Sequence, residues 1–219
     1  MPVITALTPD SRRPSRIAVL VDGAPIATVS FEIIERLGLR VGLAVDDGLR
    51  EAVKDAAEAL RVYDRAANML AARGRSAAEL RRLLVRKGEP AQHVDAAIER
   101  LVAQGYLDDA EFARQFARSK AMGAGHARFR LRQELARRGV ARATADEAID
   151  TVFADESVDE GAIVVELARK KLRSLGGVDV PTRRRRLYGF LSRRGYDPDA
   201  IRRALDEVLL DAGGDGASA

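Results

Sequence analysis

Three pairs of basic residues recur along this chain, and each pair stands directly before a glycine. The pairs are Arg86-Lys87, Arg137-Arg138 and Arg193-Arg194, and the glycines are Gly88, Gly139 and Gly195. Clustered Lys and Arg side chains can bind phosphate groups, which is how many proteins hold nucleic acids. Cations in the last turn of a helix also stabilise the helix dipole, by about 0.3–1 kcal/mol each. The pairs alone therefore leave both interpretations open.

Further basic residues lie upstream of these pairs, where the helix dipole no longer explains them. The stretch 169–194 carries ten Lys and Arg residues and a single acid, Asp179. One charged run usually covers a solvated helix face, but several runs on one chain favour a polyanionic partner. We predict that this partner is contacted by Arg81, Arg82, Arg86, Lys87, Arg128, Arg130, Arg132, Arg137, Arg138, Lys170, Lys171, Arg183, Arg184, Arg185 and Arg186.

Residues that commonly carry catalysis are scarce. The 219 residues include no Cys and only two His, His93 and His126, so thiol chemistry is excluded and histidine chemistry has little material. No Walker phosphate loop, Gly-x-Ser-x-Gly or His-x-x-x-His motif occurs. Helix capping explains Asp108, Asp109 and Glu111 better than metal binding does. We expect a binding protein with no catalytic residue, metal or cofactor, and not an enzyme.

The glycines after the basic pairs also mark an internal repeat. When the three glycines are set in register, Leu stands four and eight residues before each of them. Apolar residues stand six, nine, ten and thirteen residues after each. This spacing predicts two helices with one apolar stripe each, the first ending at the glycine. A further helix upstream completes each three-helix unit, at roughly 49–72, 110–122 and 160–175.

The first fifty residues have a different pattern. Two short apolar runs, 17–21 and 24–29, flank Asp22-Gly23, which is typical of a two-residue β-hairpin turn. We expect further strands over 3–7 and 39–45, and a short helix over 31–37 capped by Ser30. A sheet this small needs a helix to cover its apolar face, so we expect it to pack on the helical region as a cap.

The predicted fold is mainly α: an elongated tandem array of three-helix repeats with a small N-terminal β-hairpin or sheet cap. The expected parts are a β-rich cap at 1–48, helical repeats at 49–107, 108–156 and 157–211, and a disordered tail at 212–219. No apolar run is long enough to span a membrane, and the lack of Cys agrees with a cytoplasmic location. Nothing in the sequence points to an obligate dimer, so we expect a monomer.

Four stretches of the sequence resemble the RecX family, regulators of the RecA recombinase. They are Arg75-Ser76-x-x-Glu79-Leu80-Arg81-x-x-Leu84-x-x-Lys87-Gly88, Gly105-Tyr106-Leu107-Asp108-Asp109-x-x-Phe112-Ala113, Gly125-x-x-Arg128-x-x-x-x-x-Glu134-Leu135-x-x-Arg138-Gly139 and Phe190-Leu191-x-Arg193-Arg194-Gly195-Tyr196. Their order and spacing are kept over about residues 60–210. The resemblance implies tandem three-helix repeats that are not enzymes.

The resemblance also implies a function and a partner. RecX-like proteins lodge along the groove of the RecA–DNA filament and favour its shortening. They inhibit its ATPase, coprotease and strand-exchange activities, and so act in homologous recombination, DNA repair and the SOS response. Binding to single- and double-stranded DNA by the protein alone is then expected to be weak and salt-sensitive.

Two other interpretations of the residues stay open. A sequence-specific helix-turn-helix DNA-binding regulator would bind duplex DNA tightly and in a sequence-dependent way. A scaffold whose basic pairs only cap helices would be indifferent to both DNA and salt.

Overall fold

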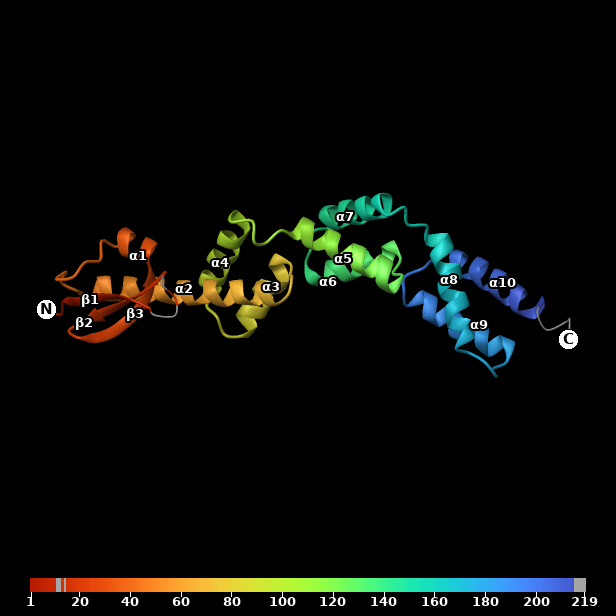
Figure 1. Ribbon diagram of the computed structural model, residues 1–219, viewed down its shortest axis with the longest axis horizontal. Helices are drawn as coiled ribbons and strands as arrows, with labels where there is room; N and C mark the ends of the chain where they lie inside the picture. The colour runs from red at the N-terminus through yellow and green to blue at the C-terminus, as the bar shows by residue number, and fades with distance from the viewer. Residues whose placement is uncertain (11–12, 14, 215–219) are drawn as a thin grey trace. The chain divides into compact units, whose positions relative to one another are not determined.

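The computed structural model of the protein describes residues 1–10, 13 and 15–214. Within these residues it contains ten helices and one three-stranded sheet (Figure 1), which confirms the predicted fold class. The chain divides into two compact units. The first unit is made of Met1–Arg75 and Glu79–Leu107, and the second of Ser76–Ala78 and the residues from Asp108 onward.

The sheet consists of β1 (Ile4–Pro9), β2 (Arg16–Val21) and β3 (Ala24–Ser30), paired antiparallel in that order. The β2–β3 turn has positive φ at both central residues, 48° at Asp22 and 82° at Gly23. Type I′ turns require this geometry, and Asp-Gly adopts it readily. The predicted hairpin and the additional N-terminal strand are therefore confirmed.

The predicted strand over 39–45 is wrong. Among the described residues this segment contributes only an isolated bridge between Val3 and Ala44. Leu39 and Val45 are buried against the sheet, which explains why the segment has a strand-like apolar pattern. Gly42, however, has a φ of +83° and turns the backbone away from an extended conformation.

Two helices cover the sheet. The short helix α1 (Phe31–Arg36) begins at Ser30, whose side chain accepts a hydrogen bond from the Ile33 N–H at 3.4 Å. The long helix α2 (Asp47–Ala72) packs its apolar stripe on the sheet, where Val53 shares a buried cluster with β-strand residues. The cap therefore has a helix over its apolar face, as so small a sheet requires.

The helical part of the chain contains three successive three-helix groups. The first repeat is α2–α4, the second α5–α7 and the third α8–α10. Their further bounds are α3 (Ala77–Arg86), α4 (Ala91–Ala103), α5 (Asp109–Ala124), α6 (Arg128–Arg138), α7 (Arg142–Asp155), α8 (Glu160–Arg173), α9 (Val180–Ser192) and α10 (Pro198–Gly214). Residues 212–214 of the predicted tail belong to α10, and residues 215–219 lie outside the described residues. No helix in the described part of the chain is long and apolar enough to cross a membrane.

Carboxylates begin five of these helices. Each accepts backbone N–H groups of the first turn at 2.7–3.2 Å, as N-caps do; they are Asp46, Asp108, Asp159, Asp179 and Asp197. The predicted capping role of Asp108 is confirmed. In the described residues no group of three or more His, Cys, Asp or Glu side chains could hold a metal ion.

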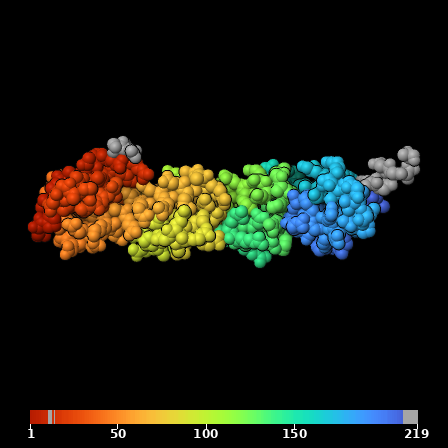
Figure 2. Space-filling view, turned by 90° about the horizontal axis from the view of Figure 1, so that it is seen from below, coloured from red at the N-terminus to blue at the C-terminus, as the bar shows by residue number. Residues whose placement is uncertain are grey.

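The register glycines have the geometry that the repeat predicts. Gly88, Gly139 and Gly195 all have φ between +83° and +89°, the left-handed conformation in which helices commonly end. The leucines four and eight residues before them are completely buried: Leu80, Leu84, Leu131, Leu135, Leu187 and Leu191. In the space-filling view the atoms of the third repeat, coloured from cyan to blue, form a continuous surface (Figure 2).

Repeats two and three are joined tightly within the second unit. The Ala127 N–H donates to the Arg194 carbonyl at 2.9 Å, and Arg194 Nε donates to the Ala124 carbonyl at 3.1 Å. A Cβ on Gly195 would lie only 2.7 Å from the backbone nitrogen of Arg130. Because no side chain fits between these backbones, the glycine is required here for close approach as well as for its φ.

Candidate functional site

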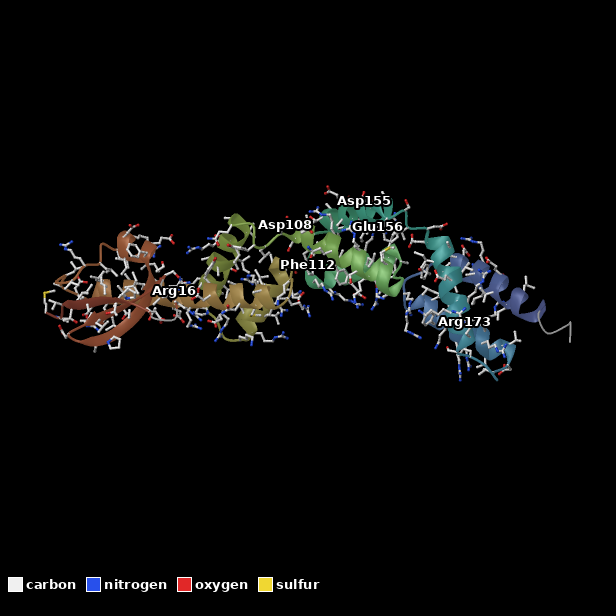
Figure 3. All side chains as sticks on the ribbon, in the orientation of Figure 1. Arg16, Asp108, Phe112, Asp155, Glu156 and Arg173 are labelled. Carbon is white, nitrogen blue, oxygen red and sulfur yellow. The ribbon has the colours of Figure 1, made fainter. Side chains whose placement is uncertain are left out.

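The predicted contact residues lie on the second helix of each repeat and on the first helix of the third repeat. Arg81, Arg82 and Arg86 lie on α3 with Lys87 directly after it, five arginines lie on α6, Lys170 and Lys171 lie on α8, and Arg183–Arg186 lie on α9. The α3 group belongs to the first unit and the other groups to the second. Figure 3 shows nitrogen-tipped side chains along the helices of both units.

Two of the predicted arginines are held by equivalent ion pairs in successive repeats. Arg81 Nε lies 2.5 Å from Asp95 Oδ1 in the first repeat, and Arg132 Nε lies 2.5 Å from Asp146 Oδ1 in the second. In each pair the arginine stands seven residues before the register glycine and the aspartate seven after it. The hydrogen bond from the arginine lowers the pKa of each aspartate.

A second set of ion pairs repeats eleven residues before and after the glycine. Arg128 pairs with Asp150 in the second repeat, and Arg184 Nη2 lies 2.8 Å from Asp206 in the third. These pairs, like the first set, join the second helix of a repeat to its third helix. Partly exposed pairs contribute only about 0–1 kcal/mol each, but they occupy arginines that the sequence suggested for an external partner.

Glu134 neutralises further cations of the second repeat. Its carboxylate accepts a hydrogen bond from Arg130 Nε at 2.8 Å and lies 3.8 Å from Arg138 Nη1. Arg138 also donates to the Glu134 carbonyl at 3.0 Å, and its guanidinium lies 4.3 Å from the centre of the Phe116 ring. His126 approaches the same carboxylate at 3.7 Å, and burial lowers the pKa of this histidine.

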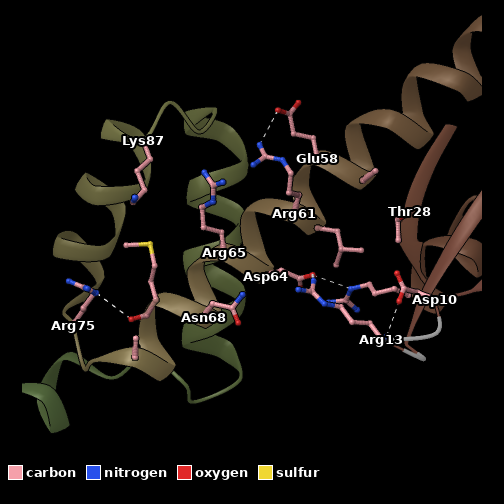
Figure 4. Close-up of a pocket in the computed structure, with 15 residues that line it drawn as sticks. Asp10, Arg13, Thr28, Glu58, Arg61, Asp64, Arg65, Asn68, Arg75 and Lys87 are labelled. Carbon is pink, nitrogen blue, oxygen red and sulfur yellow. Dashed lines mark hydrogen bonds and ion pairs between the residues drawn. The ribbon is translucent and has the colours of Figure 1, made fainter. Parts of the chain in front are cut away.

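The first unit contains a cavity of about 1070 Å³ that the sequence did not reveal. Its lining comes from the cap and from the first repeat, so residues as distant in sequence as Asp10 and Lys87 face it (Figure 4). Most cations there have acidic partners, such as Arg13 with Asp64 at 3.2 Å. No local sequence signal could have indicated this cavity because its walls come together only in the folded unit.

The buried carboxylate of Glu89 forms ion pairs with two more cations that line this cavity, Arg61 and Arg65. Its side chain is 2% exposed and receives Arg61 Nη2 at 2.6 Å together with Arg65. The hydrogen bond from Arg61 lowers the pKa of Glu89 below its ordinary value, although burial of the carboxylate acts in the opposite direction. This ion pair fastens the turn after Gly88 to α2.

Cations of the third repeat are arranged differently. No acidic residue occurs within α9, and the last turn of α8 is basic. Among the described residues no carboxylate lies within 4.0 Å of the basic side chains of Lys170, Lys171, Arg173, Arg185, Arg186 or Arg193. Arg173 is labelled in Figure 3 near the end of α8. These cations without a carboxylate partner include part of the predicted contact set, together with Arg173 and Arg193 of the same basic stretch.

The predicted run Arg183–Arg186 is divided by the helix. Arg184 is paired, as described above, and Arg183 Nε is buried without a hydrogen-bond partner in the described part of the chain. Arg185 and Arg186 are exposed. Only the last two therefore present unpaired charge to solvent, which the linear sequence could not distinguish.

Comparison with protein-family models identifies three domains in order along the chain. The first three-helix domain of RecX matches residues 63–101, the second matches 108–149 and the third matches 159–205. These matches coincide with the three helical repeats of the structure. They do not extend into the N-terminal sheet.

Named relatives give the same family. "Regulatory protein RecX" of Amycolatopsis mediterranei (strain U-32) is 37% identical over 146 residues, which are 67% of this chain and 82% of that protein. The protein of the same name from Prosthecochloris aestuarii (strain DSM 271 / SK 413) is 34% identical over 69% of this chain and 95% of its own length. A Levilactobacillus brevis relative is 29% identical over 96% of this chain and 77% of its own.

Solved structures support the fold. The "Crystal structure of regulatory protein RecX" aligns with a TM-score of 0.76 at 18% identity, covering 94% of this chain and all of that one. The crystal structure of RecX from Lactobacillus salivarius aligns with a TM-score of 0.56 at 18% identity, over 70% of this chain and 97% of that chain.

Proposed function

Because this chain belongs to the RecX family, we propose that it binds the RecA–DNA filament and inhibits the filament's ATPase, coprotease and strand-exchange activities. The observation that carries the proposal is the ordered match of three RecX three-helix domains to three successive helical repeats. The protein would thereby act as a negative regulator in recombination, DNA repair and the SOS response.

The charge distribution supports a partner that contains nucleic acid. A RecA–DNA filament exposes phosphate groups, and unpaired Lys and Arg side chains attract such groups at long range. In this chain several of those side chains lie on α8 and α9, whereas Arg81 on α3 and Arg128, Arg130 and Arg132 on α6 are held by acids of the same repeat. The proposed phosphate contacts therefore come chiefly from Lys170, Lys171, Arg185 and Arg186.

The regulator needs no reaction chemistry of its own, because ATP hydrolysis and strand exchange take place on RecA. We expect the protein to act as a cytoplasmic monomer and to bind DNA weakly, with a strong dependence on salt, when RecA is absent. A helix-turn-helix reader of duplex sequence fits less well, since Arg128 and Arg132 on α6 are occupied by Asp150 and Asp146.

Cosedimentation tests the proposed binding. Filaments of RecA on circular single-stranded DNA with a non-hydrolysable ATP analogue should carry the protein into the pellet, whereas RecA without DNA and the DNA alone at 150 mM salt should carry far less. A protein that stays in the supernatant with all three would contradict the proposal. Sequence-dependent retention by duplex DNA alone would instead favour the helix-turn-helix regulator.

A further inference from the structure

A pocket of about 360 Å³ opens on the third repeat. Four cationic side chains line it, together with two apolar side chains and a glycine: Lys171, Leu175, Arg185, Arg186, Gly189, Phe190 and Arg193. The lining comes from the end of α8, the turn after it, the middle of α9 and the residue that ends α9. No acidic residue takes part.

In the described part of the chain the cations of this pocket are not held by ion pairs, and Asp179 attracts Arg185 only from beyond 4.0 Å. Among the described residues, no carboxylate lies within 4.0 Å of its four cations. The second repeat shows why: five residues before its register glycine stands Glu134, which neutralises Arg130 and Arg138, and the third repeat has Phe190 at that position. The guanidinium of Arg194 lies 3.8 Å from the centre of the Phe190 ring. An aromatic ring therefore replaces the counter-ion.

A glycine inside α9 keeps the pocket open. Glycine within a helix is less stable than alanine by roughly 0.5–1 kcal/mol, so its presence at position 189 lowers the stability of α9. The equivalent residues of the first and second repeats are Arg82 and Gln133, whose long side chains would extend over this surface. A Cβ at Gly189 would already lie 3.4 Å from Arg193 Nη1. A side chain at this position would therefore occupy part of the pocket that Gly189 lines.

We propose that this pocket holds a nucleic-acid strand by its phosphodiester backbone. Guanidinium groups match phosphate oxygens with two parallel hydrogen bonds, and the Lys171 ammonium adds a compact point charge. The exposed Lys170 and Arg173 on the last turn of α8 continue the positive charge outside the pocket, which suits a linear polyanion better than a single small anion. The inference rests on the proposed function in one respect, namely that the strand in question is the DNA of the RecA filament.

Fluorescence anisotropy with a labelled 30-nucleotide oligo(dT) tests the pocket in the full-length protein without RecA. Combined Arg185→Gln, Arg186→Gln and Arg193→Gln should raise Kd at least tenfold. It should also reduce the slope of log K against log salt by about 2, since each phosphate contact on a single strand contributes about 0.7. The matched control is Arg169→Gln on α8 of the same repeat, whose charge is already paired with Glu207 at 2.8 Å; it should change Kd less than twofold. Equal effects of the triple variant and the control, or an unchanged slope in the triple variant, would overturn the proposal.

Gly189→Gln separates binding from folding. The substitution gives α9 the residue that the second repeat has, so the melting temperature should stay the same or rise, because glutamine is a better helix former than glycine. Binding of the oligonucleotide should nevertheless weaken, because the side chain occupies the pocket. Wild-type affinity in this variant would contradict the proposal even if the triple variant were unstable.

Competition distinguishes a strand from a small phosphate compound. Oligonucleotides should displace the labelled strand, whereas inorganic pyrophosphate should do so only at concentrations that act through ionic strength. Displacement of the labelled oligonucleotide by micromolar pyrophosphate would contradict the proposal that the pocket binds a nucleic-acid strand. If the pocket variants bind the oligonucleotide as the wild type does but the wild-type protein still inhibits RecA, the proposed function stands and only the pocket proposal is rejected. If the wild-type protein does not inhibit RecA, the proposed function is rejected, and the oligonucleotide result is unaffected.

Discussion

Replacing Gly195 by alanine should weaken the junction between the second and third repeats. Gly195 has a φ of +89°, and a Cβ there would lie 2.6 Å from Arg130 Cβ and 2.7 Å from the Arg130 backbone nitrogen. Real Cβ atoms do not approach other heavy atoms this closely, so the start of α6 would have to move. The substitution therefore introduces both backbone strain and a clash.

The two contributions can be separated with a matched control. An L-residue in the left-handed region costs roughly 1–2 kcal/mol, and overpacking of a close contact costs about 1–3 kcal/mol more. Gly195→Ala should thus destabilise the second unit by roughly 2–5 kcal/mol. Gly88→Ala has nearly the same φ, +85°, but nothing lies within 4 Å of its Cβ. It should cost only the strain, about 1–2 kcal/mol in the first unit.

Native-state hydrogen exchange is the suitable assay because a chain with two compact units has no single free energy of unfolding. The amides of Leu131 and Leu135 report on the second unit, and those of Leu80 and Leu84 on the first. Gly195→Ala should lower protection only at the former pair and Gly88→Ala only at the latter, by the smaller amount. Equal losses of free energy from the two substitutions would refute the close approach at Gly195.

Three further perturbations have defined outcomes. Glu89→Gln should destabilise the first unit by about 1–3 kcal/mol at pH 7, measured by native-state hydrogen exchange at the Leu80 and Leu84 amides, because it removes the charge-assisted hydrogen bonds from Arg61. Since the folded pKa of Glu89 is lowered, the stabilisation is complete above its unfolded value near 4.3 and is lost as pH falls through the folded pKa; the variant should lack this acid loss. A double-mutant cycle on Arg132 and Asp146 should give a coupling of about 0–1 kcal/mol that shrinks at 1 M salt. Burial lowers the pKa of His126, so the second unit should lose stability as pH falls below about 6.5, and an NMR titration should find the His126 midpoint below that of a model peptide.

Local signals predicted much of the fold. The Asp22-Gly23 turn, the caps at Ser30 and Asp108, and the glycine register all depend on a few neighbouring residues whose φ or hydrogen-bonding needs are intrinsic. The segment 39–45 was mispredicted because its apolar residues are buried without being extended. An apolar sequence pattern reflects burial rather than backbone conformation. In this segment the positive φ of Gly42 marks a turn where the pattern predicts a strand.

The candidate site was predicted less completely, for a physical reason. A list of arginines in the sequence cannot say which of them face an acid on the neighbouring helix. Arg81 and Arg185 look alike in sequence, yet Asp95 forms an ion pair with the first, and no carboxylate in the described part of the chain lies within 4.0 Å of the second. The pairs at equal distances before and after each glycine could have been found by comparing charges across the register as well as apolar residues.

The rate of ATP hydrolysis by RecA tests the central claim most directly. RecA filaments on circular single-stranded DNA are assembled with ATP, and this protein is titrated in while hydrolysis is followed continuously. If the chain regulates RecA as proposed, the rate should fall when the protein is still well below the RecA concentration, whereas a heat-denatured sample should have no effect. A rate that stays constant up to and beyond equimolar protein would contradict the account.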